Sequence, residues 1–221
     1  KEVIMKKLLF WMVLIVGIVV LLGSCAKKDD STAATVTPFT STTTAAGSIT
    51  VGSVAMSGTY VSGCNTSGVA AAVSGGYFPS DIVANRDVLV VTGNDNVSQE
   101  SHFYTDTTCS TLSGYSKNGW DNFTVGDASG DYYKVTYQEL GYKNKAGTAV
   151  WEAFYENYFS TNNITASGTT IDLVVGTEYD VGGSGSSYMN LFYVNSTIAR
   201  HGEGSTSSYP TAMDSLEMAK Q

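Results

Sequence analysis

The sequence predicts an all-β domain: an antiparallel up-and-down barrel or a sandwich of about eight strands, with a short C-terminal helix. Three observations support this fold class. Tyr, Thr, Gly, Ser and Asn outnumber Leu, Glu and Lys, and there are only 3 prolines, a composition that favours strands and turns. Short apolar and aromatic runs recur after Ser57. The Gly-, Asn- and Asp-rich segments between these runs have the chemistry of tight turns.

Eight runs are expected to be strands. They are Gly58–Ser62, Asp87–Thr92, Gln99–Thr105, Asn122–Val125, Tyr132–Leu140, Ala149–Phe159, Thr170–Val175 and Tyr188–Asn195. Alternation is clearest in the fifth run, where Tyr133, Val135 and Tyr137 share one face and polar residues share the other. This pattern is typical of a strand with one buried face.

Two segments bear on the helix content. Residues 149–159 allow a helix as an alternative, but their density of Trp, Tyr and Phe favours a strand. Residues Pro210 to Lys220 are predicted to form a short terminal helix, with Met213, Leu216 and Met218 partly on one side.

The first 24 residues have the three parts of an export signal. Counted from Met5, the chain has two lysines, an apolar run from Leu8 to Leu22, and small residues before Cys25. The alternative is an uncleaved transmembrane helix. The run is short for that role, because a bilayer span needs about 20 apolar residues.

Leu22-Gly23-Ser24-Cys25 resembles the lipobox of bacterial lipoproteins. The resemblance implies that the signal is removed, that Cys25 carries a diacylglyceryl thioether, and that its new amino group is acylated. Two or more acyl chains give stable membrane attachment. Ala26 follows the cysteine, so the resemblance also implies delivery to the outer membrane of the cell envelope, on its periplasmic or surface face.

The expected organisation has three parts: a signal segment over residues 1–24, a lipidated cysteine with a spacer over 25–56, and one β domain over 57–221. Residues 31–50 contain eight Thr together with Ala and Ser. Such a stretch buries too little surface to offset its ordering entropy, so we expect a disordered Thr/Ala/Ser-rich spacer.

The chain is acidic, with a formal charge of -8. Removing residues 1–24 takes away three lysines and one glutamate, which moves the charge to -10. Nucleic-acid binding needs basic patches, so this class of partner is excluded. Electrostatic docking on anionic lipid is disfavoured for the same reason.

Cys64 and Cys109 are the two cysteines left after Cys25. Two cysteines in an exported domain usually pair, so a disulfide is expected; two free buried thiols are the alternative.

The series of strands across residues 57–200 resembles a lipocalin-like barrel. Gly58-Thr59-Tyr60 stands in the first strand, where lipocalins carry Gly-x-Trp, and Thr105-Asp106-Thr107 partly matches their Thr-Asp-Tyr. Arg200 follows the last strand, near the place of the lipocalin stacking Arg. The resemblance implies an up-and-down barrel with an interior ligand.

Aromatic residues are concentrated in the central and late strands. The candidate ligand-binding residues are Tyr133, Tyr137, Trp151, Tyr155 and Phe192, which would line a cavity for a small apolar or glycan ligand. The alternative is that they form an ordinary barrel core. The leading hypothesis is therefore a non-catalytic binding domain, and a surface adhesion or assembly component is a second hypothesis.

An envelope hydrolase using His102 or His201 is the third hypothesis. These are the 2 histidines of the chain, and no spacing of His, Cys, Asp and Glu predicts a metal site. No Gly-x-Ser-x-Gly elbow is present and no cofactor motif is expected. A histidine in a closed pocket with two carboxylates or a serine would favour the hydrolase.

The anchor can be tested by intact mass. In the native host, the mature protein is expected to begin at Cys25 and to carry the mass of its acyl chains. An unlipidated product that retains residues 5–24 would contradict the lipoprotein prediction.

Overall fold

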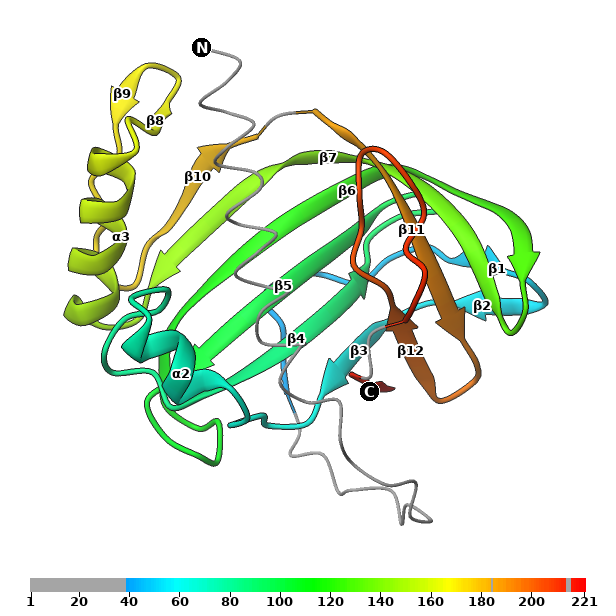
Figure 1. The fold of residues 1–221 in the computed structure, drawn as a ribbon, viewed down its shortest axis with the longest axis horizontal. Helices are drawn as coiled ribbons and strands as arrows, with labels where there is room; N and C mark the ends of the chain where they lie inside the picture. Colours follow the sequence, from blue (N-terminus) through cyan, green and yellow to red (C-terminus); the bar gives the residue numbers. More distant parts are fainter. Residues whose placement is uncertain (1–38, 184, 214–215) are drawn as a thin grey trace.

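The computed structural model describes residues 39–183, 185–213 and 216–221, which form a closed antiparallel barrel of eight strands (Figure 1). The barrel strands are β3 (Thr59–Ser62), β4 (Ala84–Val91), β5 (Val97–Tyr104), β6 (Leu112–Ser129), β7 (Tyr132–Ala146), β11 (Ser187–Val194), β12 (Ile198–His201) and β13 (Met218–Lys220). Each pairs with the next in chain order, and β13 returns to pair with β3. The prediction of an all-β, up-and-down barrel is confirmed.

The remaining described elements lie at the ends and sides of the barrel. They are β1 (Ile49–Val51), β2 (Val54–Met56), α2 (Val69–Ser74), α3 (Ala149–Thr161), β8 (Thr165–Ala166), β9 (Thr169–Thr170) and β10 (Glu178–Gly182). Strand β10 pairs with the C-terminal half of β7, and β11 pairs with the N-terminal half. Neither described helix has the length and apolar character needed to cross a bilayer.

The strand expected over Ala149–Phe159 is wrong, because this segment is helix α3. Thr148 is its N-cap, and the Thr148 hydroxyl accepts a hydrogen bond from the Trp151 backbone N–H at 3.1 Å. Trp151 and Phe159 are both buried, and Tyr155 lies between them at helical spacing. The cap and the four-residue spacing outweigh the strand propensity of the aromatic residues.

The strand expected over Thr170–Val175 is wrong beyond Thr170, where β9 ends. The backbone N–H groups of Leu173 and Val175 donate instead to the carboxylates of two α3 glutamates, at 2.9 and 3.1 Å. Side-chain acceptors on the helix thus replace a sheet partner for this segment.

The helix expected over Pro210–Lys220 is wrong as well. The described residues of this segment contain no helix, and Met218–Lys220 forms β13. Its neighbours β12 and β3 both pair with it. Two sheet ladders satisfy the backbone groups of β13, and Met218 is buried in the barrel core, so the strand conformation is preferred over an exposed short helix.

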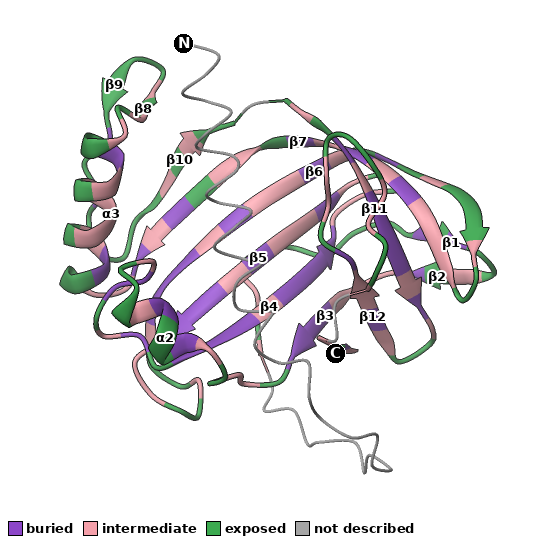
Figure 2. Ribbon diagram, viewed as in Figure 1, coloured by how far each residue is buried: buried purple, intermediate pink, exposed green. Residues whose placement is uncertain are grey.

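Side chains alternate between the barrel interior and its outer surface, which gives the banded burial seen along the strands in Figure 2. The main interior cluster contains residues from all eight barrel strands and from the β1–β2 hairpin. Its larger members are Met56, Tyr60, Leu89, Trp120, Phe123, Tyr137, Tyr188, Phe192 and Met218. This is one contiguous apolar core at one end of the barrel.

Different elements plug the two ends of the barrel. Ile49 and Met56 of the β1–β2 hairpin pack into the main interior cluster. At the other end, Val69 of α2 and Trp151 of α3 pack with Phe103 and Ala146. These residues of α2 and α3 are here called the α2–α3 plug. Figure 1 shows β1–β2 and α2 at opposite ends of the barrel. Both openings are therefore covered by apolar side chains.

The spacer expected over residues 25–56 ends earlier than the composition indicates. Residues 39–48, here called the strap, lie on the outer face of the barrel, and the β1–β2 hairpin follows. The Phe39 ring packs on a buried outer patch of valines on β3 and β4 and lies edge-on to the His102 ring, with centroids 4.8 Å apart. The Ala46 N–H donates to the Val91 carbonyl at 2.9 Å. Cys25 and the rest of the spacer lie outside the described residues.

A buried carboxylate, Glu100 of β5, lies beneath the strap and is 0% exposed. Its Oε2 is 2.7 Å from Nε2 of His102, and its Oε1 accepts hydrogen bonds from the hydroxyls of Ser41, at 3.0 Å, and Thr43. Burial by itself would raise the pKa of Glu100. The hydrogen bonds from His102 and Thr43, with the positive charges of His102 and Lys117, outweigh burial and lower it.

Lys117 of β6 extends the same cluster. Its Nζ donates to the Thr42 hydroxyl at 2.6 Å and lies 3.2 Å from a Glu178 carboxylate oxygen. The Tyr115 hydroxyl donates to the same Glu178 oxygen at 2.7 Å. The strap is therefore bound through both an apolar contact and a charged, hydrogen-bonded network.

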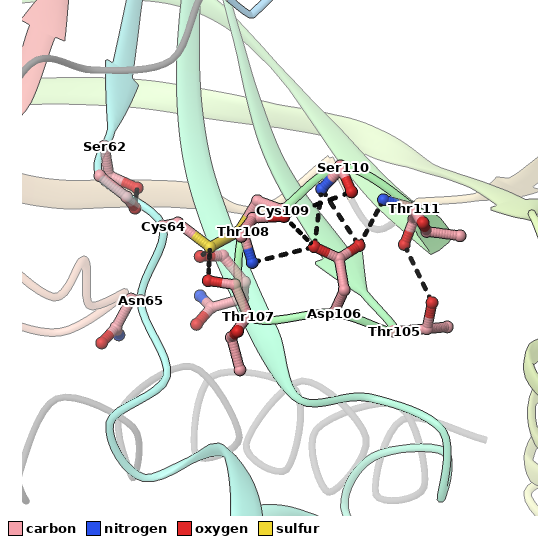
Figure 3. The surroundings of a disulfide bond; sticks show 12 residues. Ser62, Cys64, Asn65, Thr105, Asp106, Thr107, Thr108, Cys109, Ser110 and Thr111 are labelled. Carbon is pink, nitrogen blue, oxygen red and sulfur yellow. Dashed lines mark hydrogen bonds between the residues drawn. A yellow bond between two sulfur atoms is a disulfide. The ribbon is translucent and has the colours of Figure 1, made fainter.

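The predicted Cys64–Cys109 disulfide is present, and it joins the segment after β3 to the β5–β6 turn. Figure 3 shows how Asp106 organises that turn: its carboxylate accepts hydrogen bonds from the Thr108 side chain and from the backbone N–H groups of Thr108, Ser110 and Thr111. The bridge closes a loop with a sequence separation of 45 that contains α2.

Replacing both Cys64 and Cys109 with Ser is expected to lower the free energy of unfolding by about 3–4 kcal/mol, because a long loop regains its entropy in the unfolded chain. Urea unfolding of the oxidised parent and the double variant measures the difference. Equal unfolding free energies would show that the bridge does not stabilise the barrel.

The strap is expected to be released in acid. Since the folded chain lowers the pKa of Glu100 below its ordinary 4.5, the stabilisation from its ionised form is complete above that value and is lost as the pH falls through the lowered pKa. The nuclear Overhauser contact between the Phe39 and His102 rings should then disappear while that between Trp120 and Tyr137 remains.

The variant Glu100→Gln should lose the Phe39–His102 contact already at neutral pH, since it cannot carry the charge that the network binds. A strap that stays bound in this variant and in acid would contradict the role assigned to Glu100.

Candidate ligand-binding site

A cavity of about 130 Å³ lies inside the barrel, between the main interior cluster and the α2–α3 plug. Its wall combines polar and aromatic side chains. They are Gln99, Ser101, Ser116, Lys117, Asn118, Trp120, Tyr137, Glu139, Tyr142, Tyr188, Asn190 and the segment from His201 to Gly204. Glu203 is exposed, so the cavity reaches the surface at this segment.

Strand register explains why these residues meet. Asn118 of β6 is paired with Gln99 of β5 on one side and with Tyr142 of β7 on the other. Tyr137 of β7 is paired with Tyr188 of β11. Directly paired residues point to the same face of a sheet, so every one of them is brought to the interior.

The aromatic wall is a stack of nearly parallel rings. Trp120 and Tyr137 have centroids 4.3 Å apart at an interplanar angle of 19°, and Tyr137 and Tyr188 are 5.7 Å apart at 12°. Phe192 meets Trp120 edge-on at 6.1 Å. Offset stacks and edge contacts of this kind hold the rings rigidly, which gives the cavity a fixed apolar side.

The polar wall is centred on Glu139, which is only 3% exposed. Its Oε1 accepts a hydrogen bond from the Asn118 amide and one from the Tyr142 hydroxyl at 2.6 Å. Burial, and then the negative charge of Glu139, raise the pKa of Tyr142, Tyr137 and Tyr188. These tyrosines therefore stay neutral at physiological pH and keep their hydroxyl protons.

Two residues that line the cavity each have a buried polar atom with no hydrogen-bond partner among the described residues: the Tyr188 hydroxyl and Oδ1 of Asn118. Buried polar atoms are nearly always hydrogen-bonded, because an unmet donor or acceptor costs about 1–3 kcal/mol. Their presence in residues that line a cavity points to a group that enters the cavity and completes their hydrogen bonds.

The aromatic residues proposed from the sequence do not form one site. Tyr137 lines the cavity. Phe192 and Tyr133 belong to the main interior cluster beside it. Trp151 and Tyr155 lie in the α2–α3 plug, where the Trp151 indole N–H donates to Oδ1 of Asn144 at 2.9 Å.

The sequence did not point to several residues that line the cavity, among them Asn118, Trp120, Glu139 and Tyr142. Three of these are polar or carry a hydroxyl, and polar positions on a strand are ordinarily assigned to the solvent face. A sequence signal for this wall was Trp120, a large aromatic residue in a run where apolar and polar residues do not otherwise alternate clearly.

The two histidines are placed differently. His102 is buried beneath the strap on the outer face of the barrel, against Glu100. His201 lines the cavity, and its Nδ1 lies 2.8 Å from the Gly202 carbonyl oxygen. That oxygen can only accept, so Nδ1 is the donor of this hydrogen bond. In the described part of the chain, no group of His, Cys, Asp and Glu residues has the arrangement of a metal site.

No protein-family model matches the chain, and no curated protein matches it significantly. Inferences about function therefore depend on the geometry of the cavity.

A substitution at Gly204 tests how tightly the cavity wall is packed. A Cβ at this position would lie 2.5 Å from the Tyr137 hydroxyl oxygen, so Gly204→Ala is expected to lower the free energy of unfolding by about 1–3 kcal/mol. Gly63→Ala is the matched control, because a Cβ there meets nothing within 4 Å. If the two variants unfold at the same urea concentration, the wall yields more easily than its contacts indicate.

Proposed function

We propose that this protein is a lipoprotein of the bacterial cell envelope, held on the outer membrane by lipid on Cys25, whose barrel binds a small ligand in its interior cavity without catalysing a reaction. The lipobox supports the anchor. The cavity carries the binding proposal, because it joins a rigid aromatic wall to hydrogen-bonding groups inside the barrel and opens to the surface beside Glu203.

The size of the cavity limits the ligand. A volume of about 130 Å³ is close to the roughly 150 Å³ that accommodates a benzene molecule and below the roughly 300–1,000 Å³ of sites for drug-sized ligands. The cavity therefore takes a single ring or a short chain. A larger molecule can place one terminal group inside and leave the rest outside beyond Glu203, which is exposed.

A hydrolase is the second candidate, since one observation favours it. His201, Glu139 and Glu203 all line the same cavity, which brings an imidazole and two carboxylates to one place. Hydrolysis predicts that a bound compound is recovered cleaved, whereas binding alone predicts that it is recovered unchanged.

Native mass spectrometry tests the binding proposal. The full chain, purified from its native host in mild detergent, is expected to carry a non-covalent adduct of small mass. Ser116→Met should abolish the adduct, because Ser116 lines the cavity and the longer side chain fills it. Ser187→Met is the matched control, because Ser187 is exposed on the same barrel.

A parent protein that carries no adduct, and that takes up none of a panel of ring-sized sugars and aromatics, would contradict the proposed function. An adduct that survives Ser116→Met would place the binding site elsewhere on the chain.

A further inference from the structure

We infer that the cavity takes a neutral, hydroxyl-bearing ring, such as the terminal sugar of an uncharged glycan, and that Tyr188 and Asn118 bind its hydroxyl groups. This inference rests on the proposed function and names the class of ligand for the same cavity. It selects between the two ligand classes, apolar and glycan, that the aromatic wall alone leaves open.

The two atoms without partners decide between those classes. An apolar ligand would leave the Tyr188 hydroxyl and Asn118 Oδ1 buried and unsatisfied, which is unfavourable. A hydroxyl group is both donor and acceptor. The hydroxyl groups of a ligand can accept the proton of Tyr188 and donate a proton to Asn118 Oδ1, so a hydroxyl-bearing ligand satisfies both atoms.

Neighbouring residues determine that Asn118 Oδ1 accepts and that the Tyr188 hydroxyl donates. Asn118 already donates its amide N–H to Glu139, so its oxygen is the atom left to accept. Burial and the charge of Glu139 both oppose ionisation of Tyr188, which therefore remains a donor. Tyr188 is 5% exposed, so its hydroxyl has little access to bulk water.

The electrostatics of the cavity disfavour an anion. The negative charge of Glu139 acts on three tyrosines of the wall, Tyr137, Tyr142 and Tyr188. Lys117 also lines the cavity, but its ammonium is bound to Thr42 and Glu178 on the strap side. A carboxylated or phosphorylated sugar would meet this negative field in a site of low dielectric constant.

The aromatic stack complements a sugar ring. Trp120, Tyr137 and Tyr188 form the apolar wall, and the Glu139–Asn118 pair forms the polar wall facing the same volume. The C–H groups of a sugar ring are apolar while its hydroxyls lie around the rim. Such a ring matches a site with one apolar side and a few fixed hydrogen-bonding groups.

Calorimetric titration of the full chain in detergent tests the inference. The probes are the methyl glycosides of glucose, galactose and mannose, their monodeoxy analogues, methyl glucuronoside as the anion, and toluene as the apolar ring. At least one neutral glycoside is expected to bind, with methyl glucuronoside and toluene at least tenfold weaker.

Tyr188→Phe is expected to weaken the binding of that glycoside about tenfold, the effect of one buried hydrogen bond. Tyr60→Phe is the matched control, because the Tyr60 hydroxyl is buried in the same core but does not line the cavity. One monodeoxy analogue should bind the parent about tenfold more weakly and should be insensitive to Tyr188→Phe, since the partner hydroxyl is already missing.

Three results would overturn the inference. The first is a neutral glycoside whose affinity is unchanged in Tyr188→Phe. The second is preferential binding of toluene or of the glucuronoside, which leaves the proposed binding function intact but assigns another ligand class. The third is the absence of binding by every probe together with the absence of any native adduct, which removes the proposed function as well.

Discussion

The pairing of β13 with β3 is the constraint on which the rest of the structure depends. Three residues of β13 bring the last described strand back to the first strand of the barrel and turn a sheet with two open edges into a closed one. Closure removes the unpaired edges and creates an interior with two openings. The β1–β2 hairpin at one end, and α2 with Trp151 at the other, cover these openings with apolar side chains.

Closure also explains why polar residues can occupy the middle of the barrel. The plugs supply the apolar contacts at each end, so the central positions are free to carry Asn118, Glu139 and Asn190. Glu139 accepts hydrogen bonds from Asn118 and Tyr142, and Asn190 accepts one from the Leu191 N–H, which offsets part of the cost of burial. The apolar ends thus provide stability, while the polar centre provides the hydrogen-bonding groups that line the cavity.

The strand whose side chains alternate most clearly was predicted well, because Tyr133, Val135 and Tyr137 form its apolar inner face. Tyr132–Leu140 lies within β7, and Gln99–Thr105 nearly coincides with β5. The N-terminal part of β6 was missed because its inward residues include Gly114, Ser116 and Asn118, so hydrophobicity does not alternate there. The polar half of the cavity was missed for the same reason. The α3 helix was predicted as a strand because its N-cap, Thr148, precedes the aromatic run over Ala149–Phe159.

The strap has a mechanical consequence if Cys25 carries lipid. Only residues 26–38 separate the anchor from Phe39, which limits the distance between them to at most about 50 Å, the length of a fully extended chain of that size. Tension between membrane and domain would act first on the strap, because the strap lies between Cys25 and the barrel along the chain. Release of the strap would lengthen the tether by ten residues, so the strap would act as an extensible segment between the membrane and the barrel.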